Sequence, residues 1–191
     1  MTCGIDISRW QREPFDWAAE KARGTEFMFA KASQARFKDP LYKSHIAAAK
    51  SHGILTGSYH YVQPSVDIKA QVETFLAAVE PTDLPLAMDF EVAEGRPAAV
   101  LRECAWAFLN EIEQRTGKTP LFYSYLSFIN SMALDSRFAH FPLWLAEYNG
   151  RSAPSLIPGP WHTWTFWQST GTGLDRDQFN GTFDELKLLV G

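Results

Sequence analysis

Residues 85–91, Pro-Leu-Ala-Met-Asp-Phe-Glu, combine the apolar pattern of a buried β-strand with two carboxylates at its end. Side chains two positions apart on a strand point to the same face of the sheet. Asp89 and Glu91 therefore share one face, with their Cα atoms about 6.6 Å apart, while Met88 and Phe90 occupy the other. The segment predicts a strand that carries a pair of carboxylates where it leaves the sheet.

On both sides of this segment, strand-like and helix-like patterns alternate, which favours parallel βα units. Asp67 and Pro97 stand where helices begin, and Gly53 and Gly117 stand just past the points where helices end. We expect strands at residues 4–10, 27–33, 54–62, 85–91 and 120–125, and helices at residues 16–23, 41–52, 68–79 and 97–116.

The last third of the chain changes pattern. Strands are expected at residues 141–148, 161–169 and 174–179, with a Gly-, Pro- and Ser-rich loop at 149–160 and a closing helix at 182–190. About five βα units followed by three strands predict one α/β domain, residues 1–191, folded as an irregular TIM-like barrel. Complete barrels usually need about 250 residues, so missing helices would account for the shorter chain. The alternative is an open doubly wound sheet, which the absence of a Gly-rich turn after the first strand disfavours.

Composition narrows the class of protein. The net charge is −4 and Lys and Arg form no run or stripe, so we expect neither nucleic-acid binding nor a membrane partner. The first residues contain several charges and no apolar core of a secretory signal, and no stretch approaches the length of a membrane span. Cys3 and Cys104 have no metal-site spacing, so we expect two buried free thiols, with one bridge as the alternative. We expect a monomer.

The pair Asp89 and Glu91 suggests a reaction. Two carboxylates close together in a partly buried cleft repel, so one of them keeps its proton to a higher pH than the other. A protonated acid beside an ionised carboxylate is what cleavage of a glycosidic bond requires. The alternative is structural: the pair caps the next helix or binds Arg96 or Arg102.

Other carboxylates fall at strand ends. Asp6 lies between Ile5 and Ile7 on the first strand, and Asp175 and Asp177 lie on the last. If the barrel closes, the first and last strands are neighbours, and Asp6 and Asp175 would join the carboxylate pair on one rim. For Asp6, a buried structural carboxylate is an equally good interpretation.

Aromatic residues occur at matching strand ends, and 14% of the chain is aromatic, which suits either a dense core or a sugar-binding cleft. Apolar faces of sugars stack on such rings, and Tyr hydroxyls find polar partners. For a single ring, core packing is the simpler interpretation, but their joint position favours a cleft. They are Trp10, Tyr59, Tyr61, Tyr123, Trp144, Tyr148 and Trp167.

The histidines form no metal-ligand pair, and Ser124 sits in no GxSxG turn, so neither a metal site nor a serine nucleophile is expected. His45 and His52 are expected on an exposed helix face. His60, between Tyr59 and Tyr61, either contacts a catalytic carboxylate or is a core histidine.

Taken in order, several segments resemble those of the family 25 glycoside hydrolases, the Chalaropsis-type lysozymes, which include many phage endolysins. The resemblance covers nearly the whole chain, and seven segments in order make it specific. They are Gly4-Ile5-Asp6-Ile7-Ser8, Phe29-Ala30-Lys31-Ala32-Ser33, Gly57-Ser58-Tyr59-His60-Tyr61, residues 85–91, Leu143-Trp144-Leu145-Ala146-Glu147-Tyr148, Phe166-Trp167-Gln168, and Leu174-Asp175 with Asn180-Gly181.

The resemblance implies a (β/α)5(β)3 barrel that hydrolyses the β-1,4 bond after N-acetylmuramic acid in bacterial peptidoglycan, without a cofactor. It implies Glu91 as general acid and Asp89 as the carboxylate that stabilises charge by assisting the substrate's 2-acetamido group, with Asp6 and Asp175 in support. The residues expected to bind substrate are Tyr59, His60, Tyr61, Tyr123, Trp144, Tyr148, Trp167 and Gln168. A phage protein of this kind would stay in the host cytoplasm until lysis; export by another route is the alternative.

Two positions depart from the family pattern. Glu147 stands where a neutral or basic residue is more common, which could alter substrate preference, and Asp177 stands where Asn is common. Two other functions stay open at this point. A barrel that binds glycan without cleaving it would need the same aromatic residues, and a zinc-dependent peptidoglycan amidase would need a histidine set that the sequence does not display.

Overall fold

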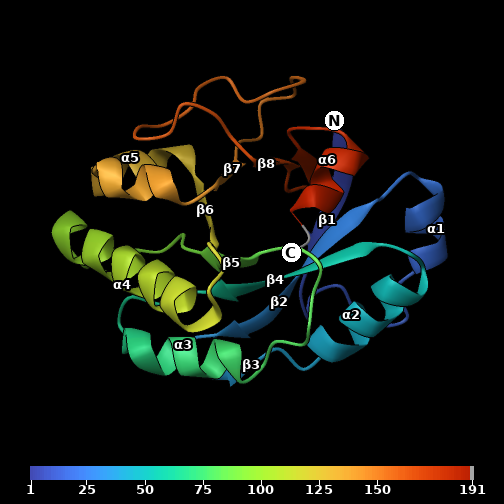
Figure 1. The fold of residues 1–191 in the computed structure, drawn as a ribbon, viewed down its shortest axis with the longest axis horizontal. Helices are drawn as coiled ribbons and strands as arrows, with labels where there is room; N and C mark the ends of the chain where they lie inside the picture. The colour runs from blue at the N-terminus through green and yellow to red at the C-terminus, as the bar shows by residue number, and fades with distance from the viewer. Residues whose placement is uncertain (190–191) are drawn as a thin grey trace.

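The computed structural model describes residues 1–189, and its centre is a closed barrel of strands. The order around the barrel is β1-β9-β8-β7-β6-β5-β4-β2, and pairing of β1 with β2 closes it (Figure 1). Closure confirms the predicted barrel and excludes an open sheet. The strands are β1 (Thr2–Ile7), β2 (Phe27–Gln34), β4 (Leu55–Tyr61), β5 (Leu86–Asp89), β6 (Leu121–Tyr125), β7 (Leu143–Ala146), β8 (Phe166–Thr170) and β9 (Asp175–Phe179).

Strand direction brings Asp6 and Asp175 to the same rim of the barrel. Neighbouring strands from β1 to β8 run parallel, whereas β9 runs antiparallel between β8 and β1. Asp175, the first residue of β9, therefore lies at the rim where the parallel strands end, in register with Asp6 of β1. The short strand β3 (Phe37–Lys38) lies outside the barrel, where it forms a hairpin with the end of β2. Two residues are too few for a strand pattern, and the sequence did not predict this hairpin.

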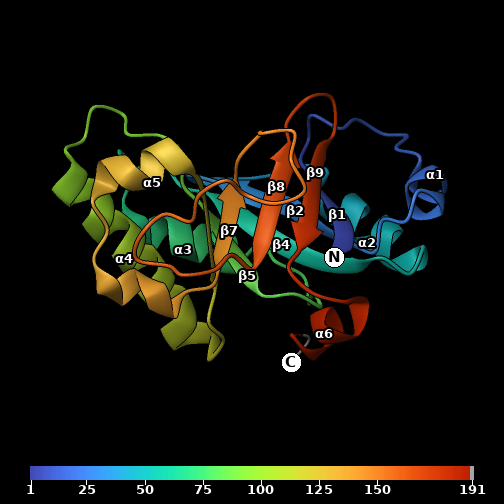
Figure 2. The same ribbon diagram turned by 90° about the horizontal axis from the view of Figure 1, so that it is seen from above.

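Helices surround only part of the barrel. Figure 2 shows β7, β8 and β9 crossed by loops, so the predicted (β/α)5(β)3 arrangement is confirmed. Within residues 1–189, no helix is both long and apolar enough to span a bilayer. The helices are α1 (Trp17–Ala22), α2 (Tyr42–Ser51), α3 (Ile68–Leu76), α4 (Ala98–Thr116) and α5 (Leu126–Met132), then the 3-10 helix η1 (Ser136–His140) and α6 (Phe183–Leu188).

Two apolar layers hold the fold together, and strand alternation separates them. On β1, Ile5 and Ile7 face the helices, whereas on β2 Phe27 and Phe29 fill the barrel interior with Trp144 and Phe166. The interior rings pack at centroid distances such as 4.5 Å for Phe29 and Trp144. Burying aromatic side chains of this size contributes most of the favourable free energy of such a core.

Two glycines in the sequence motifs make room for these rings. A Cβ atom on Gly4 would lie 2.4 Å from the ring of Phe27, and one on Gly57 would lie 2.3 Å from the ring of Phe29. Both distances are far below van der Waals contact, and the rings are held by the filled interior. These positions therefore require glycine because the barrel is filled by aromatic rings.

Several local predictions differ from the structure. Strand β8 begins at Phe166 rather than at residue 161, because Trp161 packs from a loop and donates its indole N–H to the carbonyl of Phe141 at 2.7 Å. His45 is fully buried, not exposed. Both cysteines are free, but neither is buried: Cys3 is exposed and Cys104 is partly exposed. The end of the predicted closing helix, residue 190, lies outside the described residues.

Candidate active site

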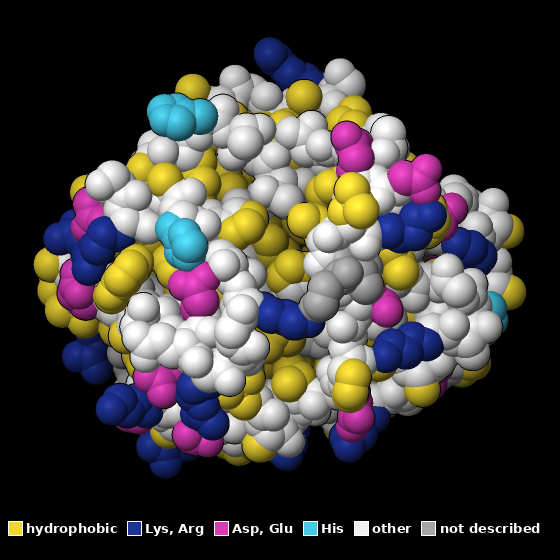
Figure 3. All heavy atoms as spheres, viewed as in Figure 1, with side chains coloured by type: hydrophobic (Ala, Val, Ile, Leu, Met, Phe, Trp, Pro, Cys, Tyr) yellow, Lys and Arg dark blue, Asp and Glu magenta, His cyan; other side chains and the backbone are white. Residues whose placement is uncertain are grey.

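A cleft of about 230 Å³ opens at the rim where the parallel strands end. This rim is where barrel enzymes of this architecture carry their active sites. On the face drawn in Figure 3, acidic and basic side chains are interspersed around the molecule, whereas the cleft has four carboxyl groups and one lysine in its lining. The cleft is lined by Asp6, Ser8, Trp10, Lys31, Tyr59, Tyr61, Asp89, Glu91, Tyr123, Trp144, Tyr148, Gln168 and Asp175.

The Asp89 and Glu91 pair lies on one face, as the strand pattern predicted. Strand β5 ends at Asp89, and the extended backbone continues far enough for Glu91 to line the cleft while Phe90 is fully buried on the other side. Neighbouring strands hold this segment. Phe90 N–H donates to the carbonyl of Tyr123 at 3.1 Å, and the Ser124 hydroxyl donates to the carbonyl of Phe90 at 2.6 Å.

Burial and mutual repulsion set the protonation of this pair. Burial, followed by the charge of Glu91, raises the pKa of Asp89 well above its usual range, and burial also raises the pKa of Glu91. The two carboxyl groups are hydrogen-bonded to each other, so a proton on one of them is shared with the other. The pair therefore holds one proton between its two members. The Oδ1 atom of Asp89 is buried and has no hydrogen-bond partner in residues 1–189.

A second carboxyl pair joins β1 to β9. The Gln168 amide donates to Oδ2 of Asp6 at 2.6 Å, and the Trp144 indole N–H donates to Oδ1 of Asp177 at 2.8 Å. Burial, followed by the charge of Asp175, raises the pKa of Asp6 to about 7. Burial, followed by the charge of Asp6, raises the pKa of Asp177 well above its usual range, and the two carboxyl groups are hydrogen-bonded to each other.

The cleft contains one cation, Lys31 of β2, among the residues that line it. Its side chain is buried, which lowers its pKa, while the charges of Asp39, Asp89 and Asp6 raise it. Four carboxyl groups face this single lysine, which explains why protons are retained in the cleft. Sequence analysis did not select Lys31, although a lysine inside an apolar strand (residues 27–33) was a visible signal.

Aromatic side chains line the mouth and the floor of the cleft. Trp10 and Tyr148 expose 69% and 60% of their surface, so their faces are open to a ligand, whereas Trp144 is buried beneath them. The Tyr123 and Tyr148 hydroxyls both donate to Oε1 of Gln168. This contact fixes the orientation of the Gln168 amide, and its NH₂ group is thereby directed at Asp6.

Two residues predicted to bind substrate do not reach the cleft. His60 is fully buried on the helix side of β4, where it hydrogen-bonds Ser33 at 2.8 Å and Gln71 at 3.1 Å, and burial lowers its pKa to about 4. Trp167 is fully buried on the outer side of β8 and donates to the carbonyl of Glu147 at 2.9 Å. Both predictions were wrong because alternation on a strand sends every second side chain to the opposite face.

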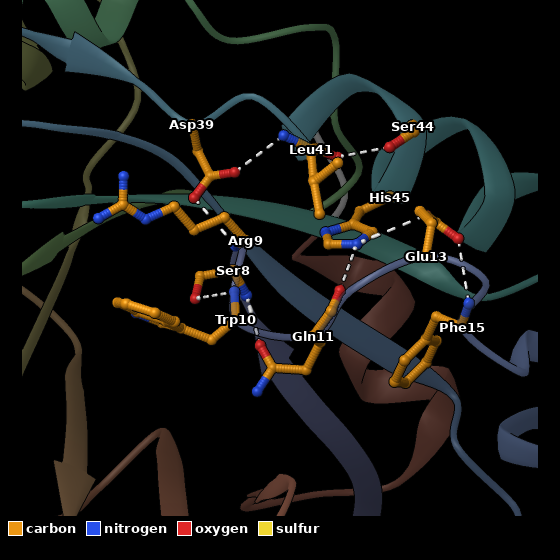
Figure 4. Close-up of polar contacts among 10 residues, drawn as sticks. All are labelled: Ser8, Arg9, Trp10, Gln11, Glu13, Phe15, Asp39, Leu41, Ser44 and His45. Atoms are coloured by element: carbon orange, nitrogen blue, oxygen red, sulfur yellow. Dashed lines mark hydrogen bonds and ion pairs between the residues drawn. The ribbon is translucent and has the colours of Figure 1, made fainter.

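The loop after β1 presents Trp10 at the cleft mouth. Figure 4 shows this loop fastened to the start of α2: Asp39 accepts from the backbone N–H groups of Arg9 and Leu41, each at 3.0 Å. The buried ring of His45 contacts the carbonyl of Gln11 at 3.1 Å. These contacts fix the backbone on both sides of Trp10.

A second hollow, of about 520 Å³, extends from Glu91 and Tyr148 along the start of α5. Glu147 lines it, but its carboxylate is already engaged. Ser155 donates to it through both its hydroxyl and its backbone N–H, and the Asn149 amide donates at 3.2 Å. The unusual carboxylate at position 147 therefore anchors the loop between β7 and β8.

Comparison with known proteins now assigns the family. The family model described as glycosyl hydrolases family 25 matches residues 5–177. The chain belongs to this family. Its members are glycoside hydrolases, so the chain is one as well.

Individual family 25 relatives align along almost the whole chain. The uncharacterized protein YegX of Escherichia coli CFT073 is 34% identical over 203 residues, covering 98% of this chain and 72% of that protein. The N,O-diacetylmuramidase of a Chalaropsis species is 29% identical and covers 98% of both chains. A family 25 lysozyme from Aspergillus fumigatus superposes with a TM-score of 0.90 at 28% identity, covering 100% of this chain and 99% of that one.

Proposed function

We propose that the protein is a muramidase that cleaves the β-1,4 bond between N-acetylmuramic acid and N-acetylglucosamine in peptidoglycan. The observation that supports this most is the Asp89 and Glu91 pair, which holds one proton in a cleft with aromatic rings at its mouth. Glycosidic cleavage needs one protonated and one ionised carboxyl group beside the scissile bond. Names of family relatives, such as N,O-diacetylmuramidase, agree with this substrate.

Substrate binding supplies the step that puts the proton on Glu91. The 2-acetamido N–H of a bound muramoyl residue would donate to the Asp89 carboxylate, which lines the cleft. A donor to Asp89 stabilises its ionised form, so the proton of the pair moves to Glu91. Glu91 then protonates the glycosidic oxygen as its bond to C1 breaks, and the acetamido oxygen forms a bond to C1 in its place.

The second half of the reaction uses the same groups in reverse. Ionised Glu91 accepts a proton from water, the water oxygen attacks C1, and the bond to the acetamido oxygen breaks. Asp89 keeps the acetamido group aligned in both steps. The Asp6 and Asp175 carboxyls stabilise the positive charge that develops at the reacting carbon. The cell wall of bacteria is the proposed site of action.

The deciding experiment digests purified peptidoglycan with the wild-type protein and with Glu91→Gln and reads the new reducing ends by mass spectrometry. Reducing N-acetylmuramic acid ends that disappear in the variant would support both the bond and the acid. Reducing N-acetylglucosamine ends would keep the glycosidase and overturn the bond. A binding-only barrel would release no reducing ends.

A zinc amidase would instead release peptide stems, and its activity would be lost in EDTA and restored by zinc. Within residues 1–189, no group of three or more His, Cys, Asp or Glu side chains is arranged to hold a metal ion. We therefore expect full activity in EDTA.

A further inference from the structure

A basic groove of about 180 Å³ adjoins the catalytic cleft on the side of β2. Its wall includes Arg9, Lys31, Gln34, Phe37 and Lys38, and Lys31 also lines the cleft, so the two hollows are neighbours. We propose that this groove binds the carboxylates of the peptide stem attached to the muramoyl residue in the cleft. The proposal rests on the proposed muramidase function and adds a second part of the substrate to it.

Charge is the first reason. The groove gathers three cations in a chain whose net charge is −4. The ion pairs found in residues 1–189 involve none of the three, Arg9, Lys31 and Lys38. The one carboxylate in the wall, Asp39, already accepts two backbone N–H groups. Lys31 is buried and faces the carboxyls of the cleft, so Arg9 and Lys38 are the cations that the groove offers to a ligand.

Fixed geometry is the second reason. The β2–β3 hairpin pairs Gln34 with Phe37 and Ser33 with Lys38. The Lys38 ammonium donates to the carbonyl of Ala77 at 2.6 Å, which ties the hairpin to the end of α3. Figure 4 shows Arg9 held by its backbone N–H while its guanidinium extends away from Asp39. Arg9 and Lys38 thus project from backbone that hydrogen bonds hold in place.

The third reason is the exposed ring of Phe37. This side chain is 77% exposed at the tip of the hairpin, beside the cations. An apolar ring next to basic groups suits a ligand that alternates small apolar and acidic residues. The stem of peptidoglycan has that character, with alanine methyl groups and carboxylates along a short peptide. Since a peptide advances about 3.3 Å per residue, its first acidic residue follows closely on the lactyl group.

The test uses two substrates that differ only in the stem: soluble uncrosslinked glycan strands with peptides, and the same strands after a muramoyl-alanine amidase has removed them. Arg9→Gln and Lys38→Gln each remove one cation and keep a polar side chain. Lys118→Gln is the matched control, because Lys118 lines a separate hollow between residues 80–86 and 116–118.

For stem-bearing strands, we expect Arg9→Gln and Lys38→Gln each to raise KM by roughly two- to fivefold at unchanged kcat, the size of a solvent-exposed ion pair. The increase should shrink as salt is added. For stem-free strands, neither variant should change KM, and Lys118→Gln should match the wild type on both substrates.

Two outcomes would overturn the proposal. Equal KM changes on both substrates would mean that the groove binds the lactyl carboxylate or another glycan anion, and no change on either would mean that it binds no part of the strand. Both outcomes leave the muramidase intact. Failure of the wild-type protein to produce reducing ends from either substrate would instead overturn the proposed function itself.

Discussion

Two buried carboxyl pairs stand on the barrel strands and differ in what surrounds them. Both members of the Asp89 and Glu91 pair line the cleft. In the Asp6 and Asp177 pair only Asp6 lines the cleft, and Trp144 and Gln168 donate to the pair at 2.8 and 2.6 Å. The comparison teaches that a shared proton does not by itself make a catalytic pair. Access to a substrate atom separates the pair that does chemistry from the pair that supports it.

The largest effect is expected from Glu91→Gln, which keeps the shape of the side chain and removes its acid. We expect kcat to fall by roughly 10³-fold, because general acid catalysis contributes about 10²–10⁴-fold. Thermal stability should hold or rise, because a buried carboxyl group is replaced by a neutral amide. Turnover of soluble glycan strands and a melting curve measure both. A variant with wild-type kcat would remove the Asp89 and Glu91 pair from the chemistry.

Asp89→Asn should follow, with a fall in kcat of roughly 10²-fold, the size of losing one preorganised electrostatic contact. The variant also removes the neighbouring charge, so the pKa of Glu91 in the working enzyme should fall. The alkaline limb of the pH profile of kcat, which reports the pKa of the acid in the substrate complex, would then move to lower pH. An unchanged limb would mean that the two carboxyl groups do not share their proton.

Substitution in the Asp6 and Asp177 pair should have a much smaller effect. In Asp177→Asn, the amide NH₂ would donate to Asp6 as the protonated carboxyl does, and the amide oxygen would still accept from Trp144. We expect kcat within about threefold of wild type, since the hydrogen bonds are retained. Asp177→Leu is the contrasting variant, and it should lose both stability and activity. A large loss in Asp177→Asn would mean that this proton takes part in catalysis.

The smallest effect expected is on folding stability as a function of pH. Asp6 has a pKa raised to about 7, so the folded state binds this proton more tightly than the unfolded chain does. Its stabilising contribution is complete below the unfolded pKa near 4 and is lost as the pH rises through about 7. The wild-type protein should therefore melt at a higher temperature at pH 5 than at pH 8, and Asp6→Asn should reduce the difference. Equal reduction in Asp135→Asn, whose carboxyl is exposed, would contradict this account.

Much of the fold was predictable because its signals are local. Asp67 begins a helix through its side chain and Gly117 ends one through its backbone, and the structure places them as the N-cap and the C-cap. The hairpin at Phe37–Lys38 was not predictable, because two residues carry no periodic pattern and its pairing with β2 depends on the barrel. The face assignments of His60 and Trp167 failed where strand alternation was not applied.

By itself, the sequence determined the order of the eight barrel strands and of helices α1 to α4, the carboxylates at the strand ends and the aromatic residues near them, because hydrophobic periodicity and residue chemistry are local properties. Only the tertiary structure decided that β9 runs backwards, so that Asp175 meets Asp6. It also decided that Lys31 is the single cation, beside four carboxyls, among the residues that line the cleft. The burial of a group, the charges around it and its hydrogen-bond partners depend on neighbours that lie far away in the chain. For that reason the protonation of this cleft could be derived only from its three-dimensional arrangement.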